Sequence, residues 1–190
     1  SGAWLDSLSF NLIDPFYALT SINSGAIDMY NYGFTSGYKN ALADPNIEVE
    51  LNSGSYNELT INPAVFSDTN QLNPFNNPAV REALNYLIDR DHIAHNIFDD
   101  LALPKFFPLM VGFPDYERYS EKTSALETKY AYDHSQAASI INTEMVNMGA
   151  SLSGDKWYYN GEPLTLIFII RNEYERLQIG DYVADQLEKV

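Results

Sequence analysis

The sequence of 190 residues contains no cysteine. A chain without thiols can form no disulfide framework, no thiolate zinc site and no cysteine nucleophile. Positive charge is also scarce, because 11 lysine and arginine residues stand against 26 aspartate and glutamate residues, for a formal net charge of −15. Such an acidic surface repels phosphate backbones and anionic lipids, so we expect no nucleic acid among its partners.

Long hydrophobic runs are missing as well. No apolar stretch reaches the roughly 18 residues that a membrane-spanning helix requires, and the longest stretch of interest, 163–170, has only the length of a strand. No signal peptide is visible, because the chain opens on three small residues, Ser1-Gly2-Ala3, and continues at once into sequence typical of folded protein. We interpret this opening as a boundary within a longer protein.

Strand and helix patterns alternate along the chain. Alternating or apolar segments predict strands over 4–13, 26–32, 47–51 and 56–62, and a β-hairpin over 156–170 with its turn at Asn160-Gly161. Caps and apolar stripes predict helices from Asp14 to Gly25 and over 36–43, 73–91, 93–98, 133–149 and 174–190. The pattern predicts an α/β (α+β) fold in a single domain over 1–190, with a mixed β-sheet flanked by helices.

Two segments of the pattern carry further expectations. Residues 101–128 are rich in proline and aromatic residues without a sustained period, which predicts a long irregular loop. The second hairpin arm, PLTLIFII over 163–170, is apolar on both faces and predicts a central strand of the sheet.

The segment NPFNNPAVREALNYLIDRDHIAHNIF, residues 73–98, resembles the N-P-F-x-D-P-x-V-R-x-A-L-N-Y-A-I-D-R signature of family 5 extracellular solute-binding proteins, the dipeptide and oligopeptide binders. Asn77 replaces the usual Asp, a change that retains a helix cap. Further segments resemble the family in the same order: INSGAIDMYNYG (22–33), LTINP (59–63) and YAYDHSQAASIINTEMVNMGA (130–150), in which His134 replaces a proline. The stretch from 156 onward is similar to an archaeal branch that binds peptides or oligosaccharides.

This resemblance implies one lobe of a periplasmic-binding-protein-like clamp, which holds a small peptide or oligosaccharide between two lobes. Permease subunits of an ABC importer would read its closure. The chain would supply most of lobe II. Lobe I of the same full-length chain would lie outside these residues, and so would the last strand of lobe II, which in peptide binders carries an acidic residue for the ligand's amino group. The expected location is extracellular or periplasmic, at the membrane through an anchor of the parent protein.

A catalytic role is the alternative. A secreted hydrolase acting on peptides or glycans would suit the acidic surface and the loop aromatics, but no nucleophile elbow or phosphate-binding loop is present. Glu48 and Glu50 form the outward face of a predicted strand. His92 and His95, near Asp99 and Asp100, could supply metal ligands, but a solvated helix face is the favoured interpretation. We therefore expect no enzyme activity, no catalytic residue, no metal and no cofactor.

Ligand contacts are expected at strand ends and in the proline-aromatic loop, because open α/β sheets bind ligands at the carboxyl ends of their strands. The candidate ligand-binding residues are Tyr30, Tyr32, Asn62, Phe107, Arg171 and Tyr174. The alternative is that the aromatic residues only pack and that Arg171 pairs with Glu173 or Glu175. For Arg81, with Asn85 and Asp89 on the same helical side, we favour structural anchoring of the helix to a loop over ligand contact.

Overall fold

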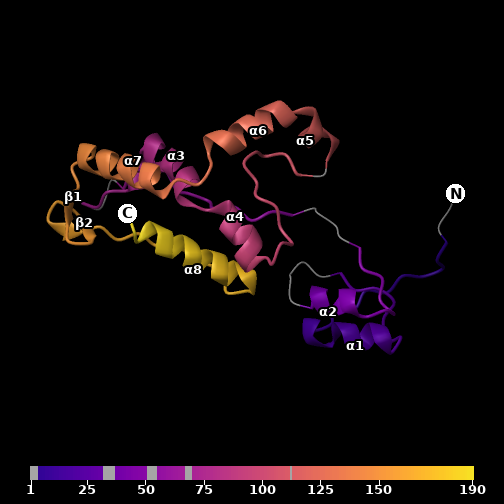
Figure 1. Ribbon diagram of the computed structural model, residues 1–190. Helices are drawn as coiled ribbons and strands as arrows, with labels where there is room; N and C mark the ends of the chain where they lie inside the picture. The colour runs from indigo at the N-terminus through magenta and orange to yellow at the C-terminus, as the bar shows by residue number, and fades with distance from the viewer. Residues whose placement is uncertain (1–3, 32–36, 51–54, 67–69, 112) are drawn as a thin grey trace. The chain divides into compact units, whose positions relative to one another are not determined.

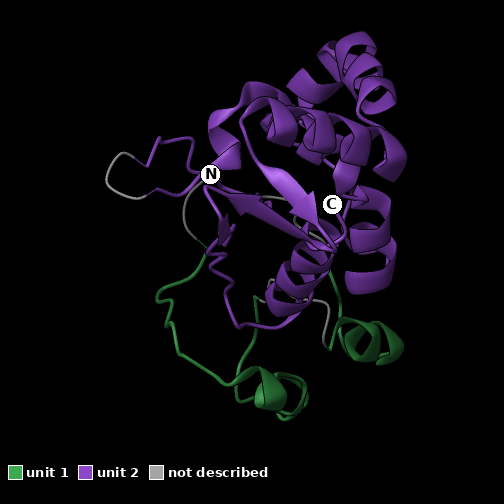
Figure 2. Cartoon of the chain, turned by 90° about the vertical axis from the view of Figure 1, so that its left-hand side faces the viewer, with its two compact units in different colours: residues 1–51 green, residues 52–190 purple. Residues whose placement is uncertain are grey.

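The computed structural model describes residues 4–31, 37–50, 55–66, 70–111 and 113–190. Their contacts group into two compact units, residues 1–51 and 52–190, which Figure 2 colours separately. The single domain expected over 1–190 stays a prediction. Within the described ranges, no helix is long and apolar enough to cross a membrane.

The first unit contains a 3-10 turn η1 (Pro15–Tyr17), a helix α1 (Ala18–Asn23) and a helix α2 (Tyr38–Ala43). Asp14 begins the first of these as expected, because its carboxylate accepts a hydrogen bond of 2.9 Å from the Phe16 amide. Gly25 follows α1 with a φ of 72°, the left-handed conformation that favours glycine at a helix end. Both ends of the predicted helix are therefore confirmed.

The strands predicted in this unit are wrong in the parts that the structure describes. Residues 4–13, 26–31 and 47–50 are irregular, while residues 32 and 51 lie outside the described ranges. The local pattern persists, since Ile47 and Val49 are half-buried and Glu48 and Glu50 are exposed. Alternation alone does not make a strand, because a strand also needs a neighbour to hydrogen-bond with.

The core of the second unit lies between α3 (Pro78–Leu87) and α7 (His134–Asn147), which run side by side in Figure 1. Their apolar stripes meet in one buried cluster: Val80, Ala83, Leu84, Leu87, Ala137, Ile141 and Met145. A short 3-10 turn η2 (Pro74–Asn76) leads into α3. Both helices were predicted, because each shows the helical period and begins at a side-chain cap. The bounds of the first were too wide, since the predicted range 73–91 is interrupted by extended residues at Asn77 and Ile88.

The caps of these helices are made as the sequence predicts. Asn77 accepts a hydrogen bond of 2.8 Å from the Ala79 amide at the start of α3. Asp133 accepts one of 2.9 Å from the Gln136 amide at the start of α7. The Asp133 amide also donates to the Tyr86 carbonyl at 2.9 Å, which ties the beginning of α7 to the last turn of α3.

Residues 101–128 are only partly irregular. The loop ends at Pro114, where α5 (Pro114–Arg118) begins, and α6 (Ser120–Lys129) follows directly. The prediction of a continuous loop was therefore wrong. The helix α6 could not be predicted because it has no apolar stripe, and Thr123 is its one buried residue. Before the loop lie α4 (Arg90–His92) and a π-helical turn η3 (Ile93–Ile97).

The sheet of this unit is small and antiparallel, with β1 (Ser151–Ser153), β2 (Lys156–Tyr159) and β3 (Glu162–Pro163) in that order. Asn160 and Gly161 have φ values of 52° and 85°, as a type I′ turn requires, which confirms the hairpin turn predicted there. Together with the flanking helices, this sheet confirms a mixed α/β class.

The central strand predicted over 163–170 was wrong beyond Pro163. Residues 164–170 are not paired as a strand, and Ile167 and Ile169 are 91% and 87% exposed. The Leu164 amide still donates a hydrogen bond of 2.7 Å to the Trp157 carbonyl of β2, but among the described residues no strand pairs with 165–170 to complete a ladder. The final helix α8 (Glu175–Leu187) was predicted correctly, and Gly180 within it packs against Ile170.

Candidate functional site

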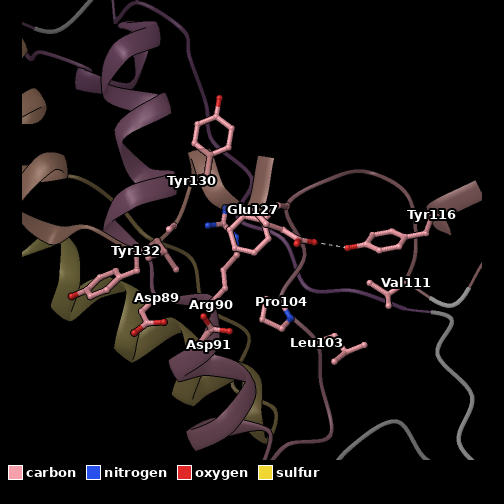
Figure 3. Close-up of a pocket in the computed structure, with 13 residues that line it drawn as sticks. Asp89, Arg90, Asp91, Leu103, Pro104, Val111, Tyr116, Glu127, Tyr130 and Tyr132 are labelled. Carbon is pink, nitrogen blue, oxygen red and sulfur yellow. Dashed lines mark hydrogen bonds between the residues drawn. The ribbon is translucent and has the colours of Figure 1, made fainter. Parts of the chain in front are cut away.

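A pocket of about 410 Å³ opens in the second unit, where several chain segments meet (Figure 3). The turn from α3 to α4, the proline-aromatic loop, both helices α5 and α6 and the segment before α7 contribute to its wall. The lining residues are Ile88, Asp89, Arg90, Asp91, Leu103, Pro104, Phe106, Val111, Tyr116, Glu127, Tyr130, Ala131 and Tyr132. The wall thus combines aromatic and aliphatic faces with both signs of charge.

Arg90 is placed in this wall by the way α3 ends. The chain leaves α3 at Ile88 in an extended conformation, and the Asp89 carboxylate then caps α4 by accepting a hydrogen bond of 2.9 Å from the His92 amide. Arg90 is therefore the first residue of α4. Its Nη1 and Nη2 donate to the backbone and side-chain oxygens of Asn85 at 3.0 and 2.7 Å.

The Arg90 guanidinium is half-buried and lies over an aromatic ring. Its central carbon is 4.6 Å from the centroid of Phe106, a residue of the proline-aromatic loop. Burial holds the pKa of Arg90 below its usual value, because a charged group loses favourable hydration there. The guanidinium nevertheless has no ion pair with any carboxylate that the structure describes.

The acidic residues of the pocket have other partners or face solvent. Glu127 accepts a hydrogen bond of 2.7 Å from the Tyr116 hydroxyl, which joins α6 to α5 and raises the pKa of Tyr116 (Figure 3). Asp91 is exposed, and Asp89 is engaged as the α4 cap. The carboxylates therefore line the pocket without neutralising Arg90.

A tyrosine of α8 supports the turn that carries Arg90. The Tyr182 hydroxyl accepts a hydrogen bond of 3.1 Å from the Asp89 amide, and its ring stacks on His92 at a centroid distance of 4.6 Å. Burial raises the pKa of Tyr182 above its usual value. Because α8 is far from α4 in sequence, this support is a product of the tertiary fold.

The two histidines of the H-x-x-H motif have separate partners. His95 is exposed and pairs with Asp100, whereas His92 is half-buried against Tyr182. The predicted solvated helix face is therefore correct for His95 and wrong for His92, because α8 covers the latter. In the described ranges, no group of three or more histidine, aspartate or glutamate side chains could hold a metal ion.

The structural interpretation of Arg81 is confirmed. Its Nη1 donates to the carbonyls of Phe75 and Asn76 at 2.6 and 3.0 Å, and so fixes α3 to the turn η2. Asn85 and Asp89, on the same side of the helix, are likewise engaged in fixing Arg90 and α4.

Two of the predicted ligand residues make local contacts in the second unit. Asn62 accepts a hydrogen bond of 3.0 Å from the Ala64 amide, and its carbonyl receives one of 2.8 Å from the Asn73 side chain. Arg171 donates to both carboxylate oxygens of Glu173 at 2.8 and 2.7 Å, which is the ion pair named as its alternative role. Neither residue lines the pocket.

The other predicted ligand residues are spread over the chain. Tyr30 is half-buried in the first unit, and Tyr32 lies outside the described residues. Phe107 is half-buried beside Phe106 in the loop, and Tyr174 is 48% exposed at the start of α8. None of the described residues among them lines the pocket, and the ligand role of all six stays a prediction.

Sequence reasoning missed the pocket residues themselves, although two signals pointed toward them. Arg90 is the last residue of the segment that resembles the family signature, and the proline-aromatic loop was expected to contribute to a site. Phe106 of that loop does line the pocket, next to the predicted Phe107. The sequence did not indicate that α6 contributes Glu127 to the same pocket wall as Arg90 and Phe106.

Comparison with known proteins identifies the family. The family model of the bacterial extracellular solute-binding proteins, family 5 Middle, matches residues 1–190. The chain therefore belongs to the family 5 bacterial extracellular solute-binding proteins. These are binding proteins, not enzymes, and serve ABC importers as their extracellular or periplasmic solute-capturing components. No curated protein matches the chain.

Proposed function

We propose that this chain helps to capture a peptide or an oligosaccharide for an ABC importer, as most of lobe II of a two-lobed clamp. The observation that carries this proposal is the pocket at Arg90, which combines hydrogen-bonding and apolar surfaces in one wall. Ligand sites are mostly apolar clefts with a few polar groups that fix the orientation of the ligand. Phe106 and Val111 supply the apolar surface of this pocket. Its polar groups come from Arg90, Asp91 and Glu127.

The pocket also fits a site that a second lobe completes. Leu103 in its wall is 66% exposed, and Tyr132 is 46% exposed. An apolar side chain this exposed at a pocket supports the proposal that lobe I of the full-length chain covers the ligand from the other side. In this arrangement, closure of the two lobes signals capture to the permease subunits, and an anchor of the parent protein holds the complex at the membrane.

A thermal-shift screen of the full-length protein with peptides and oligosaccharides tests the proposal. A true ligand at 100 times its Kd raises the free energy of unfolding by about 2.7 kcal/mol, which a melting curve detects readily. The same incubations, followed by mass spectrometry, test for bond cleavage. We expect ligands of one class to be bound and recovered intact.

Either of two results would contradict the proposal. Products of hydrolysis would identify the chain as part of a secreted hydrolase, the alternative function. Stabilisation by neither class of ligand would remove peptides and oligosaccharides as its solutes. A Glu58→Gln variant should bind as the unchanged protein does, because Glu58 is an exposed carboxylate outside the pocket wall.

A further inference from the structure

Arg90 lies at the wall of a pocket, and no carboxylate in the described part of the chain pairs with it. The guanidinium is half-buried, and its hydrogen bonds go to a neutral residue, Asn85. Removing a charge from water is costly unless an opposite charge compensates for it. The ring of Phe106 offsets part of this cost but carries no negative charge.

The guanidinium retains donors for another partner. Nη1 and Nη2 each donate to Asn85, and a guanidinium has further N–H groups beyond these. Within the described part of the chain, no other oxygen accepts from them. The planar fork of N–H groups matches the two oxygens of a carboxylate, which an arginine binds more specifically than a lysine does.

The other charges of the pocket limit the number of negative charges that a ligand can carry. Asp89, Asp91 and Glu127 line the same pocket, and the whole chain carries a net charge of −15. A group with several negative charges would be repelled by these residues, while a single carboxylate can be neutralised by Arg90. The aliphatic side chains of Leu103, Pro104 and Val111 leave room beside it for an uncharged part of the ligand.

We infer that the pocket is a subsite for a carboxylate of the solute, bound by the Arg90 guanidinium over the Phe106 ring. This inference rests on the proposed function and deepens it by naming the charged group of the ligand. Both the carboxyl terminus of a peptide and the uronic acid of an oligosaccharide carry that group. Arg90 is therefore a ligand-binding residue in addition to forming the hydrogen bonds to Asn85 that hold it in the pocket wall.

The direct test titrates the full-length protein with sodium acetate and follows the Arg90 Nε–Hε resonance by NMR. The resonance is assigned as the one that disappears in Arg90→Lys. Acetate should shift it saturably, whereas acetamide and sodium chloride at equal concentrations should not. An Arg90 resonance that acetate leaves unmoved, or that acetamide moves equally, would overturn the inference. The exposed Arg118 in α5 is the matched control, and its resonance should show no saturation.

A second experiment separates the two sources of the carboxylate. Calorimetry compares trialanine with its carboxy-terminal amide, and digalacturonate with its methyl ester. The acid of one pair should bind on the order of tenfold to a hundredfold more tightly than its neutral partner, since a hydrogen bond to a charged group has that effect. Equal affinities within both pairs would refute the carboxylate subsite.

Variants show whether the preference depends on Arg90. Arg90→Gln should reduce the ratio of acid to neutral affinity to about one, and Arg90→Lys should retain part of it. Circular dichroism verifies that each variant is folded, and the acetate titration needs no variant except for assignment. If no peptide or saccharide binds but acetate still shifts Arg90, the proposed function fails and the subsite stands. If ligands bind without any preference for acids, the proposed function stands and the carboxylate subsite fails.

Discussion

The contact between Gly180 and Ile170 allows a sharp prediction about packing. Gly180 is buried in α8, and a Cβ atom built on it would lie 2.2 Å from Ile170 Cγ2, 2.7 Å from Cγ1 and 2.9 Å from Cδ1. Non-bonded carbon atoms prefer separations of about 3.5–4.0 Å, so Gly180→Ala forces the helix or the isoleucine to move.

Two opposing terms set the magnitude. Overpacking of a core costs roughly 1–3 kcal/mol. Replacing a glycine by alanine inside a helix otherwise stabilises by roughly 0.5–1 kcal/mol, because alanine loses less conformational freedom on folding. We therefore expect Gly180→Ala to lower the free energy of unfolding by about 1 kcal/mol.

Urea denaturation of a double-mutant cycle measures the effect. Ile170→Ala removes all three atoms that the new methyl group would meet, so Gly180→Ala should become stabilising by up to about 1 kcal/mol in that background. The change of sign between the two backgrounds is the diagnostic result. An equal stabilisation by Gly180→Ala with and without Ile170 would refute the close packing of α8 on this segment.

Three further predictions concern single side chains. Asn77→Asp retains the cap but replaces a donor that lies 2.6 Å from Glu144, so it should destabilise by about 1 kcal/mol in urea denaturation, and a second change, Glu144→Gln, should restore stability. Arg81→Met should lower the free energy of unfolding by roughly 1–3 kcal/mol in the same assay, because it removes both hydrogen bonds to the backbone carbonyls of η2; an unchanged midpoint would argue against the anchor. NMR titration should show a raised pKa for His95, and Asp100→Asn should return this pKa toward its usual value. Because the pKa is higher in the folded state, the pair stabilises the fold below the unfolded pKa of His95. This contribution is lost as the pH rises through the folded pKa.

The helices of the second unit could be predicted because their signals are local. Asn77 and Asp133 are caps, and the apolar residues of α3 and α7 recur with the helical period. Both features act within a few residues, so they are legible without knowledge of the fold. The weakly amphipathic α6 had no such stripe and was missed.

The strands were predicted less well because pairing is not a local property. The hairpin at Asn160-Gly161 formed as expected, since its two arms are joined by the turn itself. Residues 165–170 and 47–50 have the composition of strands but no described strand to pair with. Composition therefore identified segments suited to a sheet and not the sheet itself.

The sequence by itself determined the family, through the ordered segments around the signature at 73–98, and it determined the capped helices of the second unit. Only the tertiary structure decided which distant groups meet. Asn77 faces Glu144, Tyr182 supports the turn at Asp89, and Glu127 joins Arg90 in one pocket. Caps and periods are set by neighbours along the chain, whereas a pocket wall is set by helices that the fold brings together from far apart in sequence.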